Sequence, residues 1–181
     1  MKFFKILLIT FIALTVSVKA DLKKNLEEGG KLIFIRHAYA PGNGDPQNFN
    51  LNDCLTQRNL SDSGRKQAKI IGNIFSKTNV SLGGIFSSEW CRCKETARIA
   101  FSKFETKKFL NSFYSAQFAN NRKKQVQEFE NFLKKWNKKD NLIFVTHYVV
   151  ISEILNYAPS SGEIVIADKN LNIVDTLEIE Y

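Results

Sequence analysis

The sequence Leu-Ile-Phe-Ile-Arg-His-Ala at residues 32–38 joins four consecutive apolar residues to an arginine–histidine pair. A short apolar run without alternation is typical of a strand that is buried on both faces of a sheet. The same pattern returns at residues 142–147, Leu-Ile-Phe-Val-Thr-His. The two runs therefore predict two buried strands. Each is followed by one of the two histidines of the chain, His37 and His147.

Amphipathic segments and further short runs alternate along the rest of the chain. Helices are expected to begin after Ser61 and near Cys91, and two more are expected to include Val126, Phe129, Leu133 and Trp136, and residues 149–155. Further strands are expected at 84–86, at 109–110, and in a closing hairpin of 162–167 and 172–179. Such alternation predicts an α/β fold, a three-layer sandwich with a mainly parallel central sheet flanked by helices.

The N-terminus has the three parts of a secretory signal. A positively charged start precedes an almost unbroken apolar run over residues 6–18, and Ala20 follows where a signal peptidase cleaves. A membrane-spanning helix needs roughly 20 apolar residues, so cleavage is expected rather than anchoring. We predict a signal peptide at 1–20, a single domain at 21–181, and a periplasmic or secreted protein without a membrane span after cleavage.

The composition indicates a globular body with a basic surface. Hydrophobic residues make up 44% of the chain, which favours a folded domain over disorder. The net charge is +8, and removing the three lysines of residues 1–20 leaves 8 − 3 = +5. This positive charge either lies on a solvated surface without further role, or attracts anionic substrates and an anionic envelope. Aromatic residues do not interleave with the lysines, so no nucleic-acid partner is expected.

The chain has three cysteines, Cys54, Cys91 and Cys93. In an exported protein this number predicts one disulfide and one remaining thiol. Cys91 and Cys93 are too close along the chain to pair with each other, so Cys54 is expected to pair with one of them. No zinc-type spacing of Cys and His occurs, and no metal is expected.

The predicted strand ends bring together two histidines and two arginines. Arg36 and His37 end the first run, His147 ends the second, and the run at 84–86 leads to Arg92. Ligands of open α/β sheets bind at the carboxyl ends of strands, and the arginine fork suits phosphate oxygens. These groups favour phosphoryl transfer over acyl transfer. Since neighbouring side chains of a strand point to opposite faces, the chain must leave strand geometry near His37.

The motifs, in their order, resemble those of the histidine phosphatase (phosphoglycerate mutase-like) superfamily. Residues 32–38 are similar to its Arg-His-Gly signature, and 60–68 to the segment leading into its first helix. Residues 87–97 are similar to its Ser-Ser-Pro-x-x-Arg-x-x-x-Thr-Ala block, and 145–147 to the approach to its second histidine. An exported bacterial subgroup is indicated by the segments 41–46, 54–60, 90–93 and 159–163.

The resemblance implies a metal-independent phosphomonoesterase that needs no cofactor. His37 would attack phosphorus and form a phosphohistidine, which water hydrolyses. Arg36 and Arg92 would hold the non-bridging oxygens, Arg58 would be a third arginine of the pocket, and His147 would stabilise the transferring group. The expected substrate is a small phosphorylated compound or a phosphate group of the envelope.

The proton donor is the point at which the chain departs from the superfamily. Many members take a carboxylate from the segment after the second helix, but residues 107–121 contain no Asp or Glu. The candidates are Asp45, Asp53 and Glu89. Because of this departure, and because Ala38 replaces the usual glycine, a second hypothesis is a weak or inactive member that binds a phosphorylated or anionic ligand.

Overall fold

A computed structural model describes residues 23–78 and 80–181. It contains a six-stranded sheet with the strand order β3-β2-β4-β1-β5-β6. The strands are β1 Leu32–Arg36, β2 Leu82–Ser87, β3 Glu105–Thr106, β4 Asn141–Thr146, β5 Ile164–Ala167 and β6 Ile173–Leu177. The helices are α2 Asp62–Thr78, α3 Cys91–Phe101, α4 Ala116–Ala119, α5 Arg122–Lys134 and α6 Tyr148–Leu155, with 3-10 turns η1 Cys54–Thr56 and η2 Lys108–Leu110.

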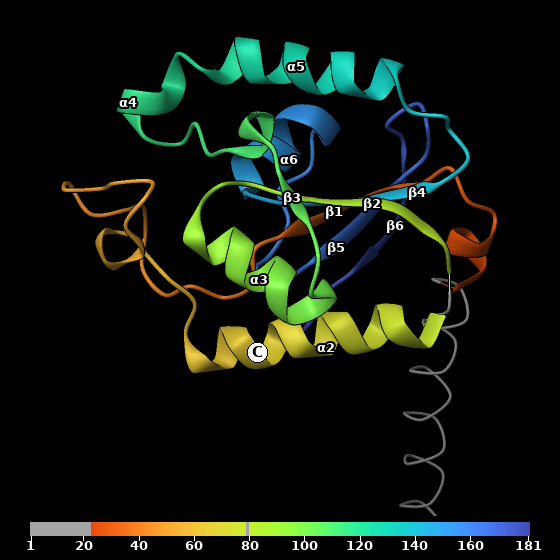
Figure 1. Cartoon of the computed structure of the whole chain (residues 1–181), viewed down its shortest axis with the longest axis horizontal. Helices are drawn as coiled ribbons and strands as arrows, with labels where there is room; N and C mark the ends of the chain where they lie inside the picture. Colours follow the sequence, from red (N-terminus) through yellow and green to blue (C-terminus); the bar gives the residue numbers. More distant parts are fainter. Residues whose placement is uncertain (1–22, 79) are drawn as a thin grey trace, which may run out of the picture.

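The sheet is mainly parallel and carries helices on both faces. Strands β1, β4, β2 and β3 pair in parallel, β5 is antiparallel to β1, and β6 is antiparallel to β5. Figure 1 shows α2 and α3 on one face and α5 and α6 on the other. The predicted three-layer α/β sandwich is therefore confirmed. The carboxyl ends of β1, β4 and β2 meet at one edge of the sheet.

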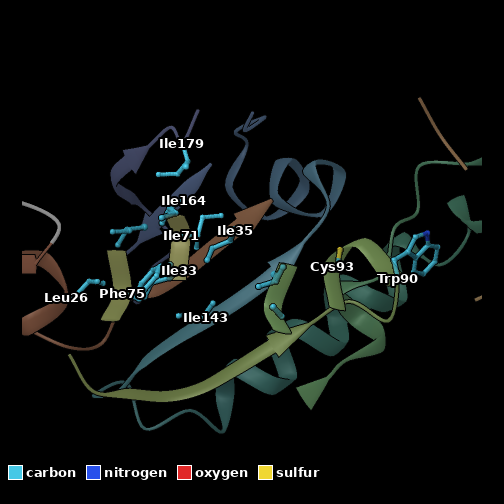
Figure 2. Close-up of a cluster of buried hydrophobic side chains, with 13 residues drawn as sticks. Leu26, Ile33, Ile35, Ile71, Phe75, Trp90, Cys93, Ile143, Ile164 and Ile179 are labelled. Carbon is cyan, nitrogen blue, oxygen red and sulfur yellow. The ribbon is translucent and has the colours of Figure 1, made fainter. Parts of the chain in front are cut away.

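The apolar runs are buried on both faces because successive side chains point in opposite directions. Ile33 and Ile35 lie in the cluster that contains Ile71 of α2 (Figure 2). Phe34 lies in the opposite cluster, with Phe129 of α5. Continuous apolar sequence is thus required by helices that cover both faces of the sheet.

One predicted element is wrong. Residues 109–110 were expected to form a strand, but they lie in the 3-10 turn η2, and the edge strand is Glu105–Thr106. Phe109 and Leu110 are both buried in the same core cluster. Two consecutive residues of a strand would point to opposite faces, whereas a tight helical turn lets both reach one core.

The start of α2 packs against the chain that follows His37. Ser61 is the predicted N-cap, and its hydroxyl accepts a hydrogen bond from the Gly64 amide at 3.1 Å. A side chain at Gly64 would collide with the backbone carbonyl of Tyr39. Glycine is therefore needed for this close approach, which places α2 beneath the segment that carries the candidate nucleophile.

The signal peptide predicted at residues 1–20 lies outside the described residues. Across residues 23–78 and 80–181, no helix has the length and apolar character of a membrane span.

Candidate active site

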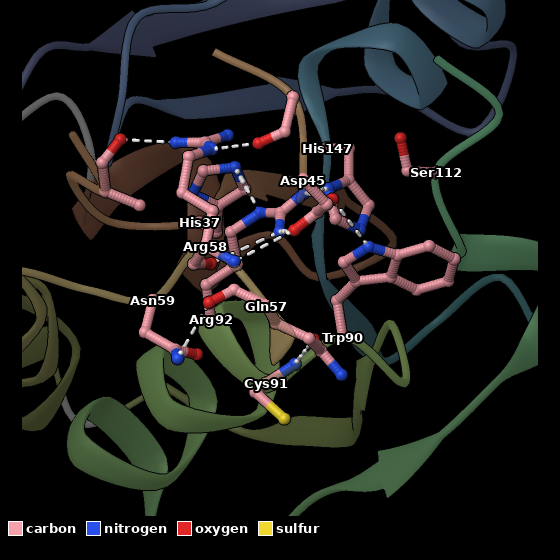
Figure 3. Close-up of polar contacts among 12 residues, drawn as sticks. His37, Asp45, Gln57, Arg58, Asn59, Trp90, Cys91, Arg92, Ser112 and His147 are labelled. Atoms are coloured by element: carbon pink, nitrogen blue, oxygen red, sulfur yellow. Dashed lines mark hydrogen bonds and ion pairs between the residues drawn. The ribbon is translucent and has the colours of Figure 1, made fainter. Parts of the chain in front are cut away.

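Five of the predicted side chains line one pocket at the carboxyl edge of the sheet. They are Arg36, His37, Arg58, Arg92 and His147, and Figure 3 labels the last four. They come from the end of β1, the long loop before α2, the first turn of α3 and the residue after β4.

The backbone leaves strand geometry at His37, as the sequence required. Strand β1 ends at Arg36, and the His37 amide donates to the Thr146 carbonyl at 2.9 Å. The next amide, of Ala38, donates to Thr96 Oγ1 at 3.0 Å. Ala38 is not among the residues with positive φ in the described part of the chain. Alanine is therefore compatible with this turn, although the signature that residues 32–38 resemble has glycine at this position.

His37 is held as a neutral imidazole with one nitrogen facing the pocket. Its Nδ1 lies 2.9 Å from the Ala38 carbonyl, to which it donates. Nε2 therefore carries the lone pair, and it accepts from Arg92 Nε at 3.2 Å. Burial, followed by the charge of Arg92, lowers the pKa of His37 well below its usual value. A neutral ring whose Nε2 carries a lone pair and no proton is the form that a nucleophile needs.

His147 lies beside His37, with 5.5 Å between the ring centroids. Its Nδ1 lies 3.4 Å from Arg92 Nη2, a donor, so Nε2 carries the proton and donates to Ser88 Oγ at 2.9 Å. Ser88 in turn donates to Asn111 Oδ1 at 3.1 Å. Burial, then the charges of Arg92 and His37, lower the pKa of His147 well below its usual value. The imidazole of His147 that lines the pocket is therefore neutral.

Ser88 and Asn111 orient His147, and sequence reasoning missed both. Ser88 lies within the 87–97 motif, which could have predicted it as a site residue. Asn111 lies in the 107–121 segment, which contains no carboxylate and from which no site residue was predicted. Its amide also accepts from the Glu89 backbone at 2.8 Å and donates to the Glu89 carboxylate at 2.7 Å.

Arg92 is the central cation of the pocket. Only 3% of its side chain is exposed. Its Nε contacts His37, while Nη1 and Nη2 donate to the two carboxylate oxygens of Asp45 at 2.7 and 3.2 Å. One guanidinium thus connects the candidate nucleophile to an anion through a bidentate pair.

Arg36 and Arg58 reach the pocket from two different segments of the chain, the end of β1 and the loop before α2. Arg36 donates from Nη1 to the Pro159 carbonyl at 2.9 Å, and its guanidinium lies 5.3 Å from the centre of the Tyr148 ring. Its Nε is buried and has no acceptor among the described residues. Arg58 donates from Nε to the Gly44 carbonyl at 2.8 Å. Burial, then the nearby Arg92, lower the pKa of Arg58 to about 10.

The three candidate proton donors lie in different environments. Asp45 lines the pocket, and it also accepts from the Arg58 amide and from Trp90 Nε1. Burial raises the pKa of Asp45, but hydrogen bonding and charge from Arg92 outweigh it, so the net shift is downward. Asp53 caps η1 through the Leu55 amide, and Glu89 pairs with Asn111. Neither Asp53 nor Glu89 is part of the pocket wall.

The charges of the pocket suit a doubly charged anion. Among the described residues, its wall contains three guanidinium groups and one carboxylate, a sum of 3 − 1 = +2 with both histidines neutral. In residues 23–78 and 80–181, no three His, Cys, Asp or Glu side chains are arranged to hold a metal ion.

A disulfide joins Cys54 to Cys91. Cys93 is a free thiol, buried 3.5 Å from His147 Nε2, and burial raises its pKa to about 12. The Cys91 amide also donates to Gln57 Oε1 at 2.9 Å. The disulfide thus ties the loop that carries Arg58 to the start of α3.

Reducing this disulfide is expected to destabilise the protein by about 4 kcal/mol, because the crosslink closes a loop with a sequence separation of 37 residues. Urea unfolding with and without reductant measures the effect. A Cys54→Ser/Cys91→Ser double variant is the control, since reductant should not change its midpoint. A wild-type midpoint that stays constant after thiol titration has confirmed reduction would contradict the expectation.

The two buried neutral histidines predict a dependence of stability on pH. Both have a lowered pKa in the folded protein, so unfolding takes up protons once the pH falls below the unfolded value of about 6.5. The free energy of unfolding should therefore decrease as the pH falls from 7 to 5.5, with a limiting slope of about 2.7 kcal/mol per pH unit for two histidines. Urea unfolding at stepped pH measures it. His37→Asn should halve this slope, and an unchanged slope would show that His37 is protonated in the folded state.

Comparisons with known proteins establish the fold. No protein-family model matches the chain, and no curated protein matches it either. A structure from Agrobacterium tumefaciens assigned as the phosphohistidine phosphatase SixA is 15% identical, with a TM-score of 0.57, covering 82% of this chain and 97% of its own. Phosphoglycerate mutase from Thermus thermophilus is 16% identical, with a TM-score of 0.56, covering 83% and 99%.

The chain therefore has a phosphoglycerate mutase-like fold, the fold that its motifs predicted. Identities of this size establish the fold alone. The chemistry of this chain depends on the residues of its own pocket.

Proposed function

We propose that the protein is a phosphomonoesterase that transfers the phosphate of its substrate to His37 and then to water. The observation that carries this proposal is the His37 ring itself. Its Nδ1 is engaged by a carbonyl, and its Nε2 lone pair faces a pocket with three arginines. A neutral nucleophile among cations suits attack on a phosphate dianion, since the cations stabilise the charge that develops on the oxygens.

The pocket groups would divide the work of the reaction. His37 Nε2 would form the bond to phosphorus, and Arg92 and Arg58 would hold the non-bridging oxygens. The buried Nε of Arg36 would gain an acceptor from the same phosphate. His147, fixed by Ser88, would stabilise the transferring group. No metal or other cofactor is needed for these steps.

The substrate class proposed is a small phosphate monoester or a phosphate group of the cell envelope, reached after export. Two observations support export. The first twenty residues have the pattern of a secretory signal, and the Cys54–Cys91 disulfide is of a kind that persists in oxidising compartments. Mass spectrometry of the protein recovered from an exporting host should give Asp21 as the first residue. An N-terminus that retains residues 1–20 would count against cleavage of the predicted signal peptide.

The test of the function is hydrolysis of a generic aryl phosphate in the presence of a chelator, from acidic to neutral pH. Release of inorganic phosphate that survives chelation supports the phosphatase and distinguishes it from a mutase. A wild-type protein that turns over nothing but binds phosphate or vanadate would instead support an anion-binding member of the superfamily.

A further inference from the structure

The carboxylate of Asp45 already occupies the donors that a phosphate would need. Its Oδ1 accepts from Arg92 Nη1 at 2.7 Å and from the Arg58 amide at 3.0 Å. Its Oδ2 accepts from Arg92 Nη2 at 3.2 Å and from Trp90 Nε1 at 3.1 Å. These four donors form a small oxyanion site, and Figure 3 shows Trp90 beside His147.

This site overlaps the place where phosphorus must lie for attack by His37. Arg92 contacts His37 Nε2 through Nε, and its two terminal nitrogens hold Asp45. A phosphate within bonding reach of His37 Nε2 would need the same terminal nitrogens. Two anions at one guanidinium fork repel each other strongly. A bound phosphate and the observed Arg92–Asp45 pair are therefore mutually exclusive.

The segment around Asp45 lies at the surface, and its backbone is held at Gly44, whose carbonyl accepts from Arg58 Nε at 2.8 Å. Residues 41–43 and 46–48 are exposed on both sides of it. The disulfide tethers the loop further along, at Cys54. Asp45 itself is held by side-chain contacts to Arg92, Trp90 and the Arg58 amide, and a phosphate can take over those donors.

We propose that the substrate phosphate displaces the Asp45 carboxylate from Arg92, and that the displaced carboxyl group then protonates the leaving oxygen. This inference rests on the proposed phosphatase function. Arg92 lowers the pKa of Asp45 in the unliganded protein. Losing that partner and facing a phosphate dianion both favour the protonated carboxyl. Binding of the substrate itself thus converts an internal anion into an acid.

Transfer of the phosphate to His37 forms one bond to phosphorus and breaks another. The Nε2 lone pair of His37 forms the N–P bond, and the electron pair of the breaking P–O bond passes to the leaving oxygen. That oxygen takes the proton of the Asp45 carboxyl, which it gained from the substrate monoanion or from water. In the second half, water attacks phosphorus, the N–P pair returns to Nε2, and Asp45 accepts a proton from the attacking water.

Asp45→Asn tests both the displacement of the carboxylate and its role as an acid. Asp53→Asn is the matched control, because Asp53 lies in the same loop but outside the pocket. Binding of inorganic phosphate, measured by calorimetry, should become about tenfold tighter in Asp45→Asn, because the competing charge is gone. For a glycerol phosphate, whose alkoxide needs a proton, kcat/KM should fall about 100-fold. For p-nitrophenyl phosphate, whose phenolate leaves without a proton, kcat/KM should not fall. Asp53→Asn should change none of these values.

The displacement and the acid role can be overturned separately. Unchanged or weaker phosphate binding in Asp45→Asn overturns the displacement, and an equal loss of kcat/KM on both esters overturns the acid role. Absence of any turnover by the wild-type protein overturns the acid role together with the phosphatase proposal. A crystal structure of the wild-type protein with vanadate needs no variant. Asp45 should then lie away from Arg92, and a retained bidentate pair would overturn the displacement.

Discussion

Replacing His37 by asparagine is expected to lower the hydrolysis of an aryl phosphate by roughly 10⁴-fold or more, as loss of a covalent nucleophile does in other enzymes. The reason is the Nε2 lone pair, which the Ala38 carbonyl and Arg92 direct into the pocket. Asparagine has no nitrogen lone pair of comparable nucleophilicity. The three arginines remain, so phosphate binding should persist while turnover is lost.

Labelling with a radioactive phosphate ester separates the nucleophile from the second histidine. Rapid denaturation during turnover should trap a protein-bound phosphate that is labile in acid and stable in base. His37→Asn should abolish this label. His147→Asn, the matched variant, should slow its formation yet leave it on His37. Label that persists in His37→Asn would assign the nucleophile to another residue.

Replacing Arg92 by lysine is expected to lower kcat/KM by about 10²–10³-fold, the effect of removing one donor from a preorganised oxyanion site. Lysine keeps the positive charge beside Asp45, so the variant avoids leaving a carboxylate without a cation. It loses the planar fork that contacts His37, His147 and Asp45 together. The loss should therefore appear in catalysis more than in folding.

Arg98→Lys is the control for this substitution, because Arg98 lies on the same helix α3 and is exposed. It should leave kcat/KM and the unfolding midpoint unchanged. If Arg92→Lys retains wild-type kcat/KM on both aryl and alkyl phosphates, the guanidinium fork is not part of the transition-state site.

The sequence by itself determined the fold and the strand ends that form the candidate site. Runs such as residues 32–35 and 142–145 encode burial on both faces within one segment, without knowledge of the rest of the chain. The arginine and histidines follow these runs directly, so parallel pairing of β1 with β4 brings His37 and His147 to one edge. The strand expected at 109–110 failed because two adjacent apolar residues do not distinguish a strand from a tight turn.

Only the tertiary structure decided which groups meet across the pocket. Asp45 and Arg92 are 47 positions apart, and the path of a long loop selects Asp45 over Asp53 as the carboxylate at the arginine. Cys91 rather than Cys93 pairs with Cys54, because two residues of a helix point about 200° apart and only one of them faces the loop. The protonated nitrogen of each histidine depends on the Ala38 carbonyl and on Ser88. Local pattern encodes burial and secondary structure, whereas contacts between distant segments depend on how the whole chain packs.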